Sequence, residues 1–506
     1  MLNHFNSKFI VFSILCSFFI SLGFTLSNYI HIPINGAVDL VLNIFHFCIV
    51  ALGILVLCYL LSINKYLFTI LFPIVVLLSA IVSFFIYTLN LTFTTSVLDA
   101  ALHNDFRTSL DVISFPFILY LLISLLISAF AIFFRLKYIK FKFKWMELSL
   151  IPIAAFAVYS VNRARNNSIF QRLPFSIYFV GNTYFSQIQS CDQPRQKIGT
   201  DATTNADSLT LVLVIGEACR ADHMQLNGYE RKTNPNLANL NVISYSHVYS
   251  EWTHTNASLP HFLTRSDSSN HNPAIKEQSF ISIFNRCSYN TSWLANQEPA
   301  PSYLPFTKES QSIIYVNPAN SVYTFNKKWL DTDIIIHLEK QLSLTSPKKF
   351  IILHTIGSHW WYNDHFTDSL AIFKPILKTK NVSPENKTEM INSYDNTIVY
   401  TDYFLSKVIT RLQTLNACLI YLSDHGESLG ENGKWLHAQD NDTEKYPACI
   451  IWCSEKYQNL HPKTFANIEF NKNKRWRTEF LFSSILSMAD INTRIKKEKL
   501  DLTKRN

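Results

Sequence analysis

Charged residues are scarce in this sequence of 506 residues, and the scarcity is concentrated in its first third. Asp, Glu, Lys and Arg make up 16% of the chain, against about 25% in an average soluble protein. Residues 1–162 contain eight Lys or Arg and five Asp or Glu, whereas residues 163–506 contain 37 and 32. The first third is therefore too apolar for a water-soluble domain, and a wholly cytosolic enzyme is excluded. The rest has the composition of a globular domain that is large enough to bury a full core.

The sequence also lacks the motifs that define several protein classes. Nine cysteines are present but form no Cys-x-x-Cys pair, which argues against a metal cluster or a zinc knuckle. The net charge of +8 is accompanied by no zinc finger and no basic helix, so nucleic acid is not a predicted partner. No small-x-small cleavage site follows the first apolar run, and we interpret that run as a membrane anchor and not as a signal peptide.

Five apolar runs in the first third are long enough to cross a bilayer as helices. A single run of this kind is also typical of a buried core helix, but five in succession with almost no charge favour a membrane domain. The fifth is the shortest, because Glu147 begins it and Asn162 ends it. The predicted spans are residues 9–26, 37–62, 67–89, 113–134 and 147–162.

The loops between these runs predict the orientation of the chain. Five cations crowd the link between the fourth and fifth runs, whereas the loop from about 90 to 112 is mainly acidic. Because short cytoplasmic loops are rich in Lys and Arg, the amino terminus is predicted inside and the carboxy-terminal domain outside, in the periplasm if the cell has one. We therefore predict a transmembrane domain at 1–162, a surface-lying connector and linker at 163–207, and an extracytoplasmic domain at 208–506. The five cations are Arg135, Lys137, Lys140, Lys142 and Lys144; the loop carries Asp99, Asp105, Asp111 and Arg107.

From residue 209 onward, short β-branched runs alternate with segments of helical length. This alternation predicts an α/β domain with a mostly parallel sheet that is covered on both faces. Three of the runs lead directly into polar clusters, at 216–217, 354–359 and 423–427. Ligands of an open α/β sheet bind at the carboxyl ends of its strands, so we expect the three clusters to form one site. The predicted strands are SLTLVLVIGE, IIYVN, KFIILHTIGSH, ACLIYLSDHGE and ACIIWC.

Glu217, Asp424 and His425 supply two carboxylates and one imidazole to that site. Hard oxygen ligands together with one nitrogen suit Zn²⁺ or Mn²⁺, and they do not suit a thiolate-rich site. An Asp-His pair after one strand is more often a helix cap with a packed histidine than a pair of metal ligands. The occurrence of such clusters at three strand ends is what favours a metal.

Three segments in the same order resemble the phosphoethanolamine transferases of Gram-negative envelopes, a group that includes the lipid A modifying enzymes of polymyxin resistance. They are GEACRADHMQLNGYERKTNPNL (216–237), THTNASLP (253–260) and SDHGESLGENGKWLH (423–437). The resemblance implies a five-helix membrane bundle in the inner membrane, followed by a periplasmic domain of the sulfatase and alkaline phosphatase fold. It covers the whole architecture predicted above.

The resemblance also implies roles for particular residues. It makes Glu217, Thr255, Asp424 and His425 the ligands of a Zn²⁺ ion, and Thr255, in the T-x-T-x-x-S-x-P context, the nucleophile. Coordination to a dication activates a threonine hydroxyl, which is a poor nucleophile at neutral pH. His359 and His437 match two further active-site histidines, and either could protonate the leaving alcohol. His354 and Glu427 lie close in sequence to the predicted site residues, and we expect a packing or supporting role for them. In the acidic loop of the first third, the resemblance implies a contact of Asp99 with the donor lipid.

The chain also departs from that family. Many relatives bracket the nucleophile with a disulfide, but Glu251 and His261 occupy those positions here. The segment TIGSHWWYNDHF, with Trp360 and Trp361, differs from the lipid A enzymes and leaves the acceptor open. The remaining cysteines match no pairing of the family, and no disulfide is predicted; they are Cys191, Cys219, Cys287, Cys418, Cys449 and Cys453.

The function that follows is a two-step transfer of phosphoethanolamine from phosphatidylethanolamine to lipid A or another lipid-linked glycan, through an intermediate on Thr255. One alternative within the same fold is a glycerol phosphate transferase, phosphatase or sulfatase. A sulfatase requires a C/S-x-P-x-R motif, which the nucleophile region lacks. An alternative of a different class is a catalytically silent envelope protein that binds lipid or partners.

Overall fold

The chain divides into two compact units in a computed structural model. The first comprises residues 1–98 and 113–183, and the second comprises residues 99–112 and 184–506. The structure describes residues 7–31, 37–89, 91, 93–103, 110–141, 145–164, 173–191, 194–297, 300–317 and 328–505. Lys142, Lys144, Asp105 and Arg107 of the predicted loops lie outside these ranges.

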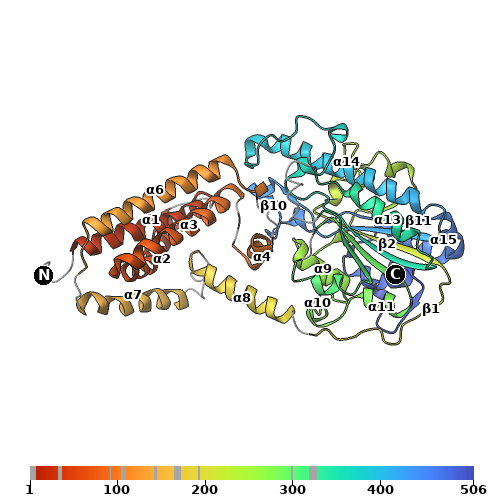
Figure 1. Cartoon of the computed structure of the whole chain (residues 1–506), viewed down its shortest axis with the longest axis horizontal. Coiled ribbons are helices and arrows are strands. Elements are labelled where there is room, and N and C mark those ends of the chain that lie inside the picture. Colours follow the sequence, from red (N-terminus) through yellow and green to blue (C-terminus); the bar gives the residue numbers. More distant parts are fainter. Residues whose placement is uncertain are drawn as a thin grey trace. The chain divides into compact units, whose positions relative to one another are not determined.

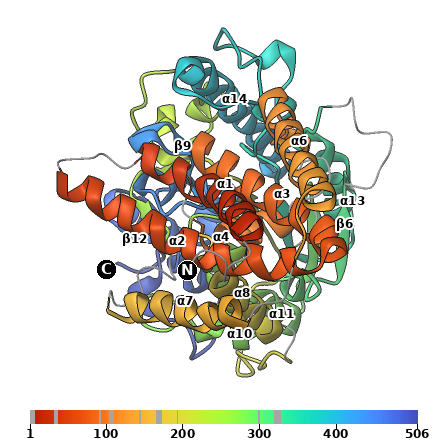
Figure 2. The ribbon, with the colours of Figure 1, turned by 90° about the vertical axis from the view of Figure 1, so that its left-hand side faces the viewer.

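All five predicted apolar runs form helices of the first unit (Figures 1 and 2). They are α1 (Ser7–His31), α2 (Ala37–Ile63), α3 (Lys65–Leu89), α6 (Phe115–Lys137) and α7 (Trp145–Ala164). Within the described residues, α1, α2, α3 and α6 are long and apolar enough to cross a membrane. The fifth predicted span corresponds to α7, a helix of 20 residues.

Polar side chains define the ends of these apolar helices. Ser114 precedes α6, and its side chain accepts a hydrogen bond from the amide of Phe117 at 3.4 Å, as an N-cap does. At the other end of α6, the buried Arg135 donates from Nε to the carbonyl of Ser62 at 2.8 Å, and it also reaches Ile63 and Ile139. The guanidinium thereby satisfies carbonyls that the end of α2 leaves without an intrahelical partner.

The second unit is built on a seven-stranded mixed sheet with the order β3-β11-β8-β2-β7-β5-β6. The central strands β8, β2, β7, β5 and β6 run parallel, and β11 runs antiparallel to both of its neighbours. The strands are β2 (Leu209–Gly216), β3 (Ile243–Tyr245), β5 (Asn290–Ala295), β6 (Ser312–Tyr315), β7 (Lys348–His354), β8 (Ala417–Ser423) and β11 (Cys449–Cys453).

Each of the five predicted strand segments overlaps one of these strands, and the sheet is mostly parallel, as predicted. The ACIIWC segment forms β11, which runs antiparallel to β8. The chain leaves the carboxyl end of β8 and enters β11 beside it, where the Ser423 amide donates to the Ala448 carbonyl at 2.9 Å. Because no crossover returns the chain to the other end of the sheet, β11 runs antiparallel to β8. The pattern missed β5, whose sequence NTSWLA is half polar although five of its six residues are buried.

Helices cover both faces of the sheet, as Figure 1 shows. On one side lie α13 (Ile335–Leu342) and α14 (Lys387–Leu412), and on the other α9 (Thr255–Leu263), α10 (Asn272–Lys276) and α11 (Phe280–Arg286). The sheet and its cover bury one large apolar core, in which Phe284 stacks on Phe350 with centroids 3.9 Å apart. The remaining helices are α12 (Leu304–Thr307), α15 (Glu455–Leu460), α16 (Pro462–Phe470) and α17 (Phe480–Met488).

Three two-stranded sheets and two boundary helices complete the described strands and α-helices. The pairs are β1 (Thr203–Thr204) with β13 (Ile491–Asn492), β4 (Val248–Tyr249) with β12 (Trp476–Arg477), and β9 (Ser428–Leu429) with β10 (Trp435–Leu436). The helices α4 (Thr95–His103) and α8 (Phe175–Cys191) each cross a boundary between the units.

Residues 194–207, predicted as part of a linker, are attached to the second unit. The amide of Gln196 donates to Lys276 at 2.7 Å, the guanidinium of Arg195 lies over the ring of Phe306 at 4.1 Å, and β1 pairs with β13. The polar, low-complexity composition of this segment predicts a linker. The residues that it contacts lie about 80 to 290 positions away, and such distant partners cannot be recognised from the local sequence. The domain boundaries at 162 and 207 stay a prediction.

Candidate metal centre and nucleophile

Three neighbouring strands bring the predicted polar clusters to one edge of the sheet. The strands β7, β2 and β8 are adjacent and parallel, with Ile215 opposite His354 and Gly216 opposite Ser423. Glu217 therefore leaves β2 next to the point where Asp424 leaves β8. The register of the sheet thus joins residues that lie 207 positions apart in the chain.

The two carboxylates and the imidazole contact one another in a fully buried position. The Nε2 atom of His425 lies 3.3 Å from Oε1 of Glu217 and 3.5 Å from Oδ2 of Asp424. The orientation of the ring is set by Nδ1, which lies 2.7 Å from the carbonyl of Gly426. Oδ1 of Asp424 is held by the amides of Ala218 and His425 at 3.1 and 2.8 Å. One oxygen of each acid and one ring nitrogen are thus turned toward a common point.

Electrostatics show that this arrangement is strained without a cation. Burial and the nearby charge of Glu217 raise the pKa of Asp424 to about 7. Burial by itself would lower the pKa of His425, but Asp424 and Glu217 raise it to about 10. The pKa of Glu217 is held below its ordinary value by His425, although burial acts in the opposite direction. Two buried carboxylates that share one imidazole are therefore only partly neutralised.

The unsatisfied atoms of the cluster fit a divalent metal. Glu217 Oε1, Asp424 Oδ2 and His425 Nε2 are buried and have no hydrogen-bond partner among the residues that the structure describes. Buried polar groups normally have such partners, so three of them facing one another indicate a site for an ion. Ligand atoms of Glu217, His425 and His437 also lie within 4.8 Å of one another. Carboxylate oxygens with imidazole nitrogens are ligands that Zn²⁺ prefers.

Thr255, the predicted nucleophile, begins α9 beside these acids. Its hydroxyl donates to Oε2 of Glu217 at 3.0 Å, and its side chain is half-buried, whereas Glu217 is fully buried. Thr255 follows the N-cap His254, so it lies in the first turn of a nine-residue helix. The positive end of the helix dipole at this position favours negative charge, including that of an alkoxide or a phosphate group. The structure thus brings together all four predicted ligands.

His437 and His359 lie on the more accessible side of the site. The ring of His437 is 4.5 Å from that of His425 and 6.2 Å from that of His359, measured between centroids. Nδ1 of His437 lies 3.2 Å from Oε2 of Glu427, and Nδ1 of His359 lies 2.6 Å from the carbonyl of Trp360. Each ring is thus oriented through Nδ1, which leaves its Nε2 available to a substrate. Both residues are half-buried, unlike the acids behind them.

The residues expected in supporting positions also lie near the site. His354 is buried at the end of β7, edge-on to Trp293 and Tyr303, and burial lowers the pKa of its imidazole to about 4. Asp99, in the part of the second unit that precedes residue 113, lies 3.8 Å from Nε2 of His254 through Oδ2. His254 is the neighbour of Thr255, so Asp99 is close to the predicted nucleophile.

The sequence analysis missed several residues that hold the site in place. Nε2 of Gln297 donates to Oε2 of Glu217 at 3.0 Å. The carboxylate of Asp331 accepts from the amides of Ile356 and Gly357 at 2.8 and 3.0 Å, which fixes the turn after β7. Gly357 has φ of +47°, and a Cβ atom there would lie 2.9 Å from the carbonyl oxygen of Glu217. Each contact joins distant segments, so a local pattern offers no signal for it.

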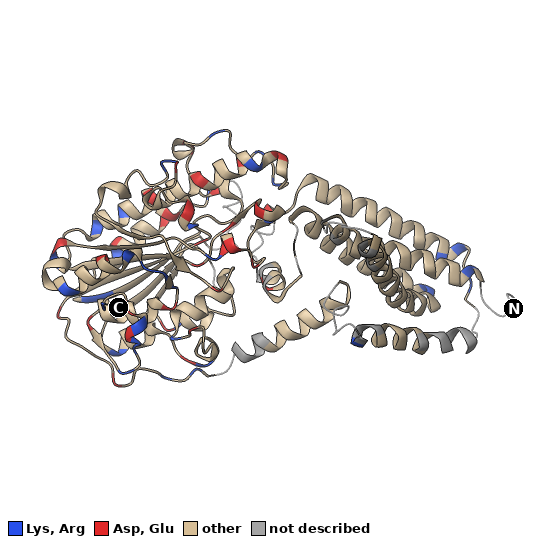
Figure 3. Ribbon diagram, turned by 180° about the vertical axis from the view of Figure 1, so that it is seen from behind, with Lys and Arg blue, Asp and Glu red and all other residues tan. Residues whose placement is uncertain are grey.

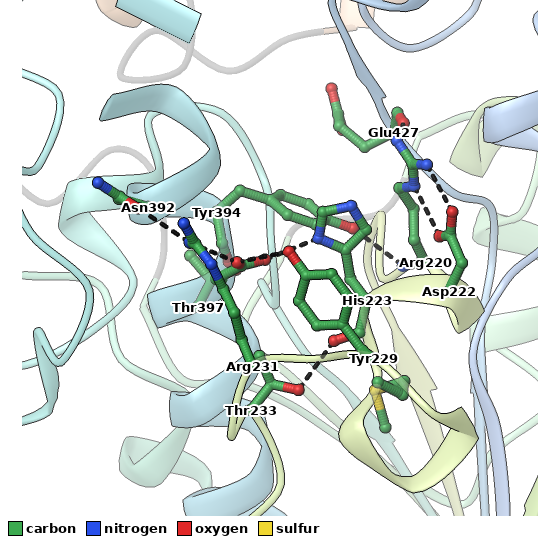
Figure 4. A network of polar contacts seen from close by, with 12 residues as sticks. Arg220, Asp222, His223, Tyr229, Arg231, Thr233, Asn392, Tyr394, Thr397 and Glu427 are labelled. Carbon is green, nitrogen blue, oxygen red and sulfur yellow. Dashed lines mark hydrogen bonds and ion pairs between the residues drawn. The ribbon is translucent and has the colours of Figure 1, made fainter. Parts of the chain in front are cut away.

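A second buried network fixes the chain directly after Glu217, and Figure 4 shows it. The hydroxyl of Tyr394, on α14, donates to the carbonyl of Ala218 at 2.7 Å and accepts from the amide of Arg220 at 2.9 Å. The next residue, Asp395, accepts from His223, Tyr229 and Arg231. The long segment that begins at Gly216 thus attaches the candidate metal site to α14.

Comparison with known proteins gives matches over both units. Residues 210–491 match the Sulfatase family. The phosphoethanolamine transferase EptA of Escherichia coli strain K12 is 29% identical over 334 residues, which cover 62% of this chain and 60% of that protein. The Kdo(2)-lipid A phosphoethanolamine 7''-transferase of the same strain is 33% identical over 273 residues, which cover 52% of this chain and 48% of that protein. The chain thus spans about half to three fifths of the length of these relatives.

A solved structure extends the likeness to nearly the whole chain. The integral membrane lipooligosaccharide phosphoethanolamine transferase A (EptA) from Neisseria meningitidis superposes with a TM-score of 0.83, at 22% sequence identity. The match covers 97% of this chain and 98% of that one. Since the identity is low, this likeness concerns the fold: an apolar helical unit joined to an α/β unit.

Proposed function

This chain belongs to the Sulfatase family, and we propose that it is a membrane-bound phosphoethanolamine transferase. The observation that carries the proposal is the placement of Thr255 at the start of a helix, with its hydroxyl 3.0 Å from Glu217. Beside it lie three buried ligand atoms that make no hydrogen bond within the described residues. The proposed donor is phosphatidylethanolamine. The proposed acceptor is lipid A or another lipid-linked glycan, in line with the names of the relatives.

We assign the metal position to Zn²⁺, held by Glu217, Thr255, Asp424 and His425. When bound there, a dication lowers the pKa of the Thr255 hydroxyl and offsets the negative charge of a phosphate group. The two acids and the imidazole are already in contact, so binding requires little rearrangement of the chain. His437, whose ligand atom lies within 4.8 Å of those of Glu217 and His425, is close enough to join the set.

In the first step, Oγ of Thr255 attacks the phosphorus of the lipid head group. The hydroxyl proton passes to Glu217 Oε2, which already accepts its hydrogen bond. A bond forms between Oγ and phosphorus while the bond between phosphorus and the glycerol oxygen breaks. His437 or His359 donates a proton to that oxygen, so that diacylglycerol leaves as a neutral alcohol. Phosphoethanolamine is then held on Thr255 as a phosphodiester.

In the second step, the acceptor oxygen enters from the side where diacylglycerol left. The histidine that gave up its proton now removes one from the acceptor, which is either a hydroxyl or a singly protonated phosphate. The new bond to phosphorus forms as the bond to Thr255 breaks, and Oγ recovers its proton from Glu217. The chain returns to its starting state, and the atoms and charges balance over the two steps.

The proposed location follows from the chemistry and from the charge distribution. A lipid donor and a lipid-linked acceptor both require a site close to a membrane surface, which four or five apolar helices provide. We place the helical unit in the inner membrane and residues 208–506 in the periplasm, where nucleotide donors are not available. The family match alone leaves open a phosphatase or another transferase of this fold, and the following experiment separates them.

The test compares envelope lipids from cells that produce the wild-type chain, Thr255→Ala and Thr410→Ala. Mass spectrometry of lipid A and of other envelope glycans should reveal phosphoethanolamine with the wild type and with Thr410→Ala, a control at an exposed site on α14. Thr255→Ala removes one hydroxyl and no core volume, so the protein should accumulate normally while transfer falls by about a thousandfold or more. Transfer by Thr255→Ala would refute the covalent mechanism. Lipids that are identical with and without the wild type would indicate a silent binding protein.

A further inference from the structure

Two cysteines face each other in the core of the second unit. Cys418 lies on β8 and Cys453 lies on β11, directly opposite each other in the antiparallel pair. Their sulfur atoms are 3.3 Å apart, and the two side chains are 0% and 2% exposed. No protein group separates them, so the two thiols are in van der Waals contact.

The register of the two strands suits a covalent bond between them. The amide of Ser454 donates to the carbonyl of Ala417 at 2.9 Å, and at the far end the amide of Ser423 donates to Ala448 at 2.9 Å. Hydrogen-bonded and non-hydrogen-bonded pairs alternate along an antiparallel ladder, so Cys418 and Cys453 form a non-hydrogen-bonded pair. The Cα atoms of such pairs are about 4.5 Å apart, which lies within the range of about 4.4 to 6.8 Å spanned by disulfides.

We propose that Cys418 and Cys453 form a disulfide bond that joins β8 to β11 in the mature protein. The two thiols lose two protons and two electrons, and one S–S bond forms. The oxidant is the disulfide of an extracytoplasmic thiol–disulfide oxidoreductase, which is reduced to its dithiol. The inference rests on the extracytoplasmic location that the proposed function assigns to this unit, since disulfides persist in oxidising compartments.

The bond forms before the sheet is complete. In the folded chain both sulfur atoms are shielded from solvent, and burial raises the pKa of the Cys418 thiol well above its ordinary value. Exchange requires an accessible thiolate, which the partly folded chain provides and the folded chain does not. Once formed, the disulfide is protected from reductants by the same burial.

The disulfide would close the loop that carries half of the active site. The two cysteines are 35 positions apart, and Asp424, His425 and His437 all lie between them. Closing such a loop restricts the unfolded chain more than the folded one, and it holds β8 in register with β11. The strand end that presents Asp424 and His425 is thereby fixed to its neighbour.

The experiment uses full-length protein purified from cells in which the second unit is exported. The protein is acid-quenched, denatured, alkylated without reduction, digested and analysed by mass spectrometry. We expect the peptides that contain Cys418 and Cys453 to be joined and to separate after reduction. Cys418→Ser should leave Cys453 alkylated, whereas the control Cys287→Ser should leave the joined peptides unchanged. Full alkylation of both cysteines in the unreduced wild type would overturn the proposal.

Transfer of phosphoethanolamine is measured in the same preparation, so that the two proposals fail separately. Joined peptides in a protein that transfers nothing would support the disulfide and refute the transferase. Transfer by a protein whose two thiols are both alkylated would refute the disulfide and leave the transferase intact. Joined peptides from chains of two different molecules, detected as a covalent dimer on a non-reducing gel, would also overturn the proposal.

Discussion

Glu217, Asp424 and His425 form an arrangement that is costly for the folded chain alone. A buried polar atom that makes no hydrogen bond costs about 1–3 kcal/mol. Three such atoms among the described residues contact one another here only as ion pairs of 3.3 and 3.5 Å. Like charges on Glu217 and Asp424 add to this cost, since the nearby charge of Glu217 and burial raise the pKa of Asp424 to about 7. A divalent cation relieves both penalties at once, so its binding should stabilise the fold and should depend on each ligand.

We therefore expect the purified protein to retain about one zinc ion per chain after dialysis. Asp424→Ala and His425→Ala each remove a ligand atom that lies within 3.5 Å of its neighbours, so both should lose most of the metal. Asp440→Ala is a suitable control, because that carboxylate is 81% exposed and pairs only at the surface with Lys445. Metal analysis by mass spectrometry is the measurement. Full retention of zinc in both ligand variants would mean that the ligand set is wrong.

At the scale of elements, the site depends on how α14 holds the segment that follows β2. Tyr394 fixes the backbone on either side of Cys219, and Asp395 collects three donors in a position that is fully buried. Nδ1 of His223 lies 2.7 Å from one oxygen of Asp395, while Tyr229 and Arg231 donate to the other at 2.9 and 2.8 Å. A buried carboxylate is tolerated only when it is paired in this way.

Asp395→Asn should destabilise the second unit by about 3 kcal/mol, since it leaves Arg231 without its charged partner and replaces an acceptor by a donor. The matched control is Asp368→Asn, which also removes a salt bridge, to Lys328 at 2.6 Å, but with a carboxylate that is 93% exposed. Surface pairs contribute about 1 kcal/mol or less. Thermal unfolding followed by tryptophan fluorescence should show a lower melting temperature for Asp395→Asn alone. Equal melting temperatures for the two variants would contradict the role of this network.

At the scale of the whole molecule, the surface of the first unit is apolar and suits lipid, whereas the surface of the second is charged and suits water. Figure 3 shows the helices of the first unit with few charged residues, whereas charges of both signs are spread over the second. Large apolar side chains such as Phe115, Leu126 and Phe156 are 70–77% exposed on those helices, which is typical of a surface that faces lipid. The matches to EptA and to the Sulfatase family confirm the predicted resemblance and fold class.

The topology of the chain decides which substrates the site can reach. Because cations crowd the link between α6 and α7, we expect a fusion of alkaline phosphatase after residue 206 to be active and a fusion after residue 142 to be inactive. Alkaline phosphatase needs an oxidising compartment to fold, so its activity reports the side of the membrane. The reverse result would place Thr255 in the cytosol and would refute the assignment to envelope lipids, although the fold would stand.

Local patterns were sufficient for much of the architecture. Whether an apolar run is buried in a bilayer or in the core of a sheet depends mainly on the composition of that run. The composition therefore predicted all five apolar helices and five of the seven strands of the main sheet. The pattern failed where partners far along the chain override composition. It missed β5, which is half polar, and it gave no sign that Thr203 and Thr204, within the predicted linker, pair with β13.

The sequence by itself determined which residues we propose for the chemistry, because the motifs around Glu217, Thr255 and Asp424 resemble those of a known family over long, ordered segments. Only the tertiary structure decided how they meet. The register of β2 with β7 and β8 sets the distances between the acids and the imidazole, and the same sheet places Cys418 opposite Cys453. A pairing of strands is a property of two distant segments at once, and neither segment carries it in its own composition. For that reason Gln297, Asp331 and the cysteine pair became visible only in the fold.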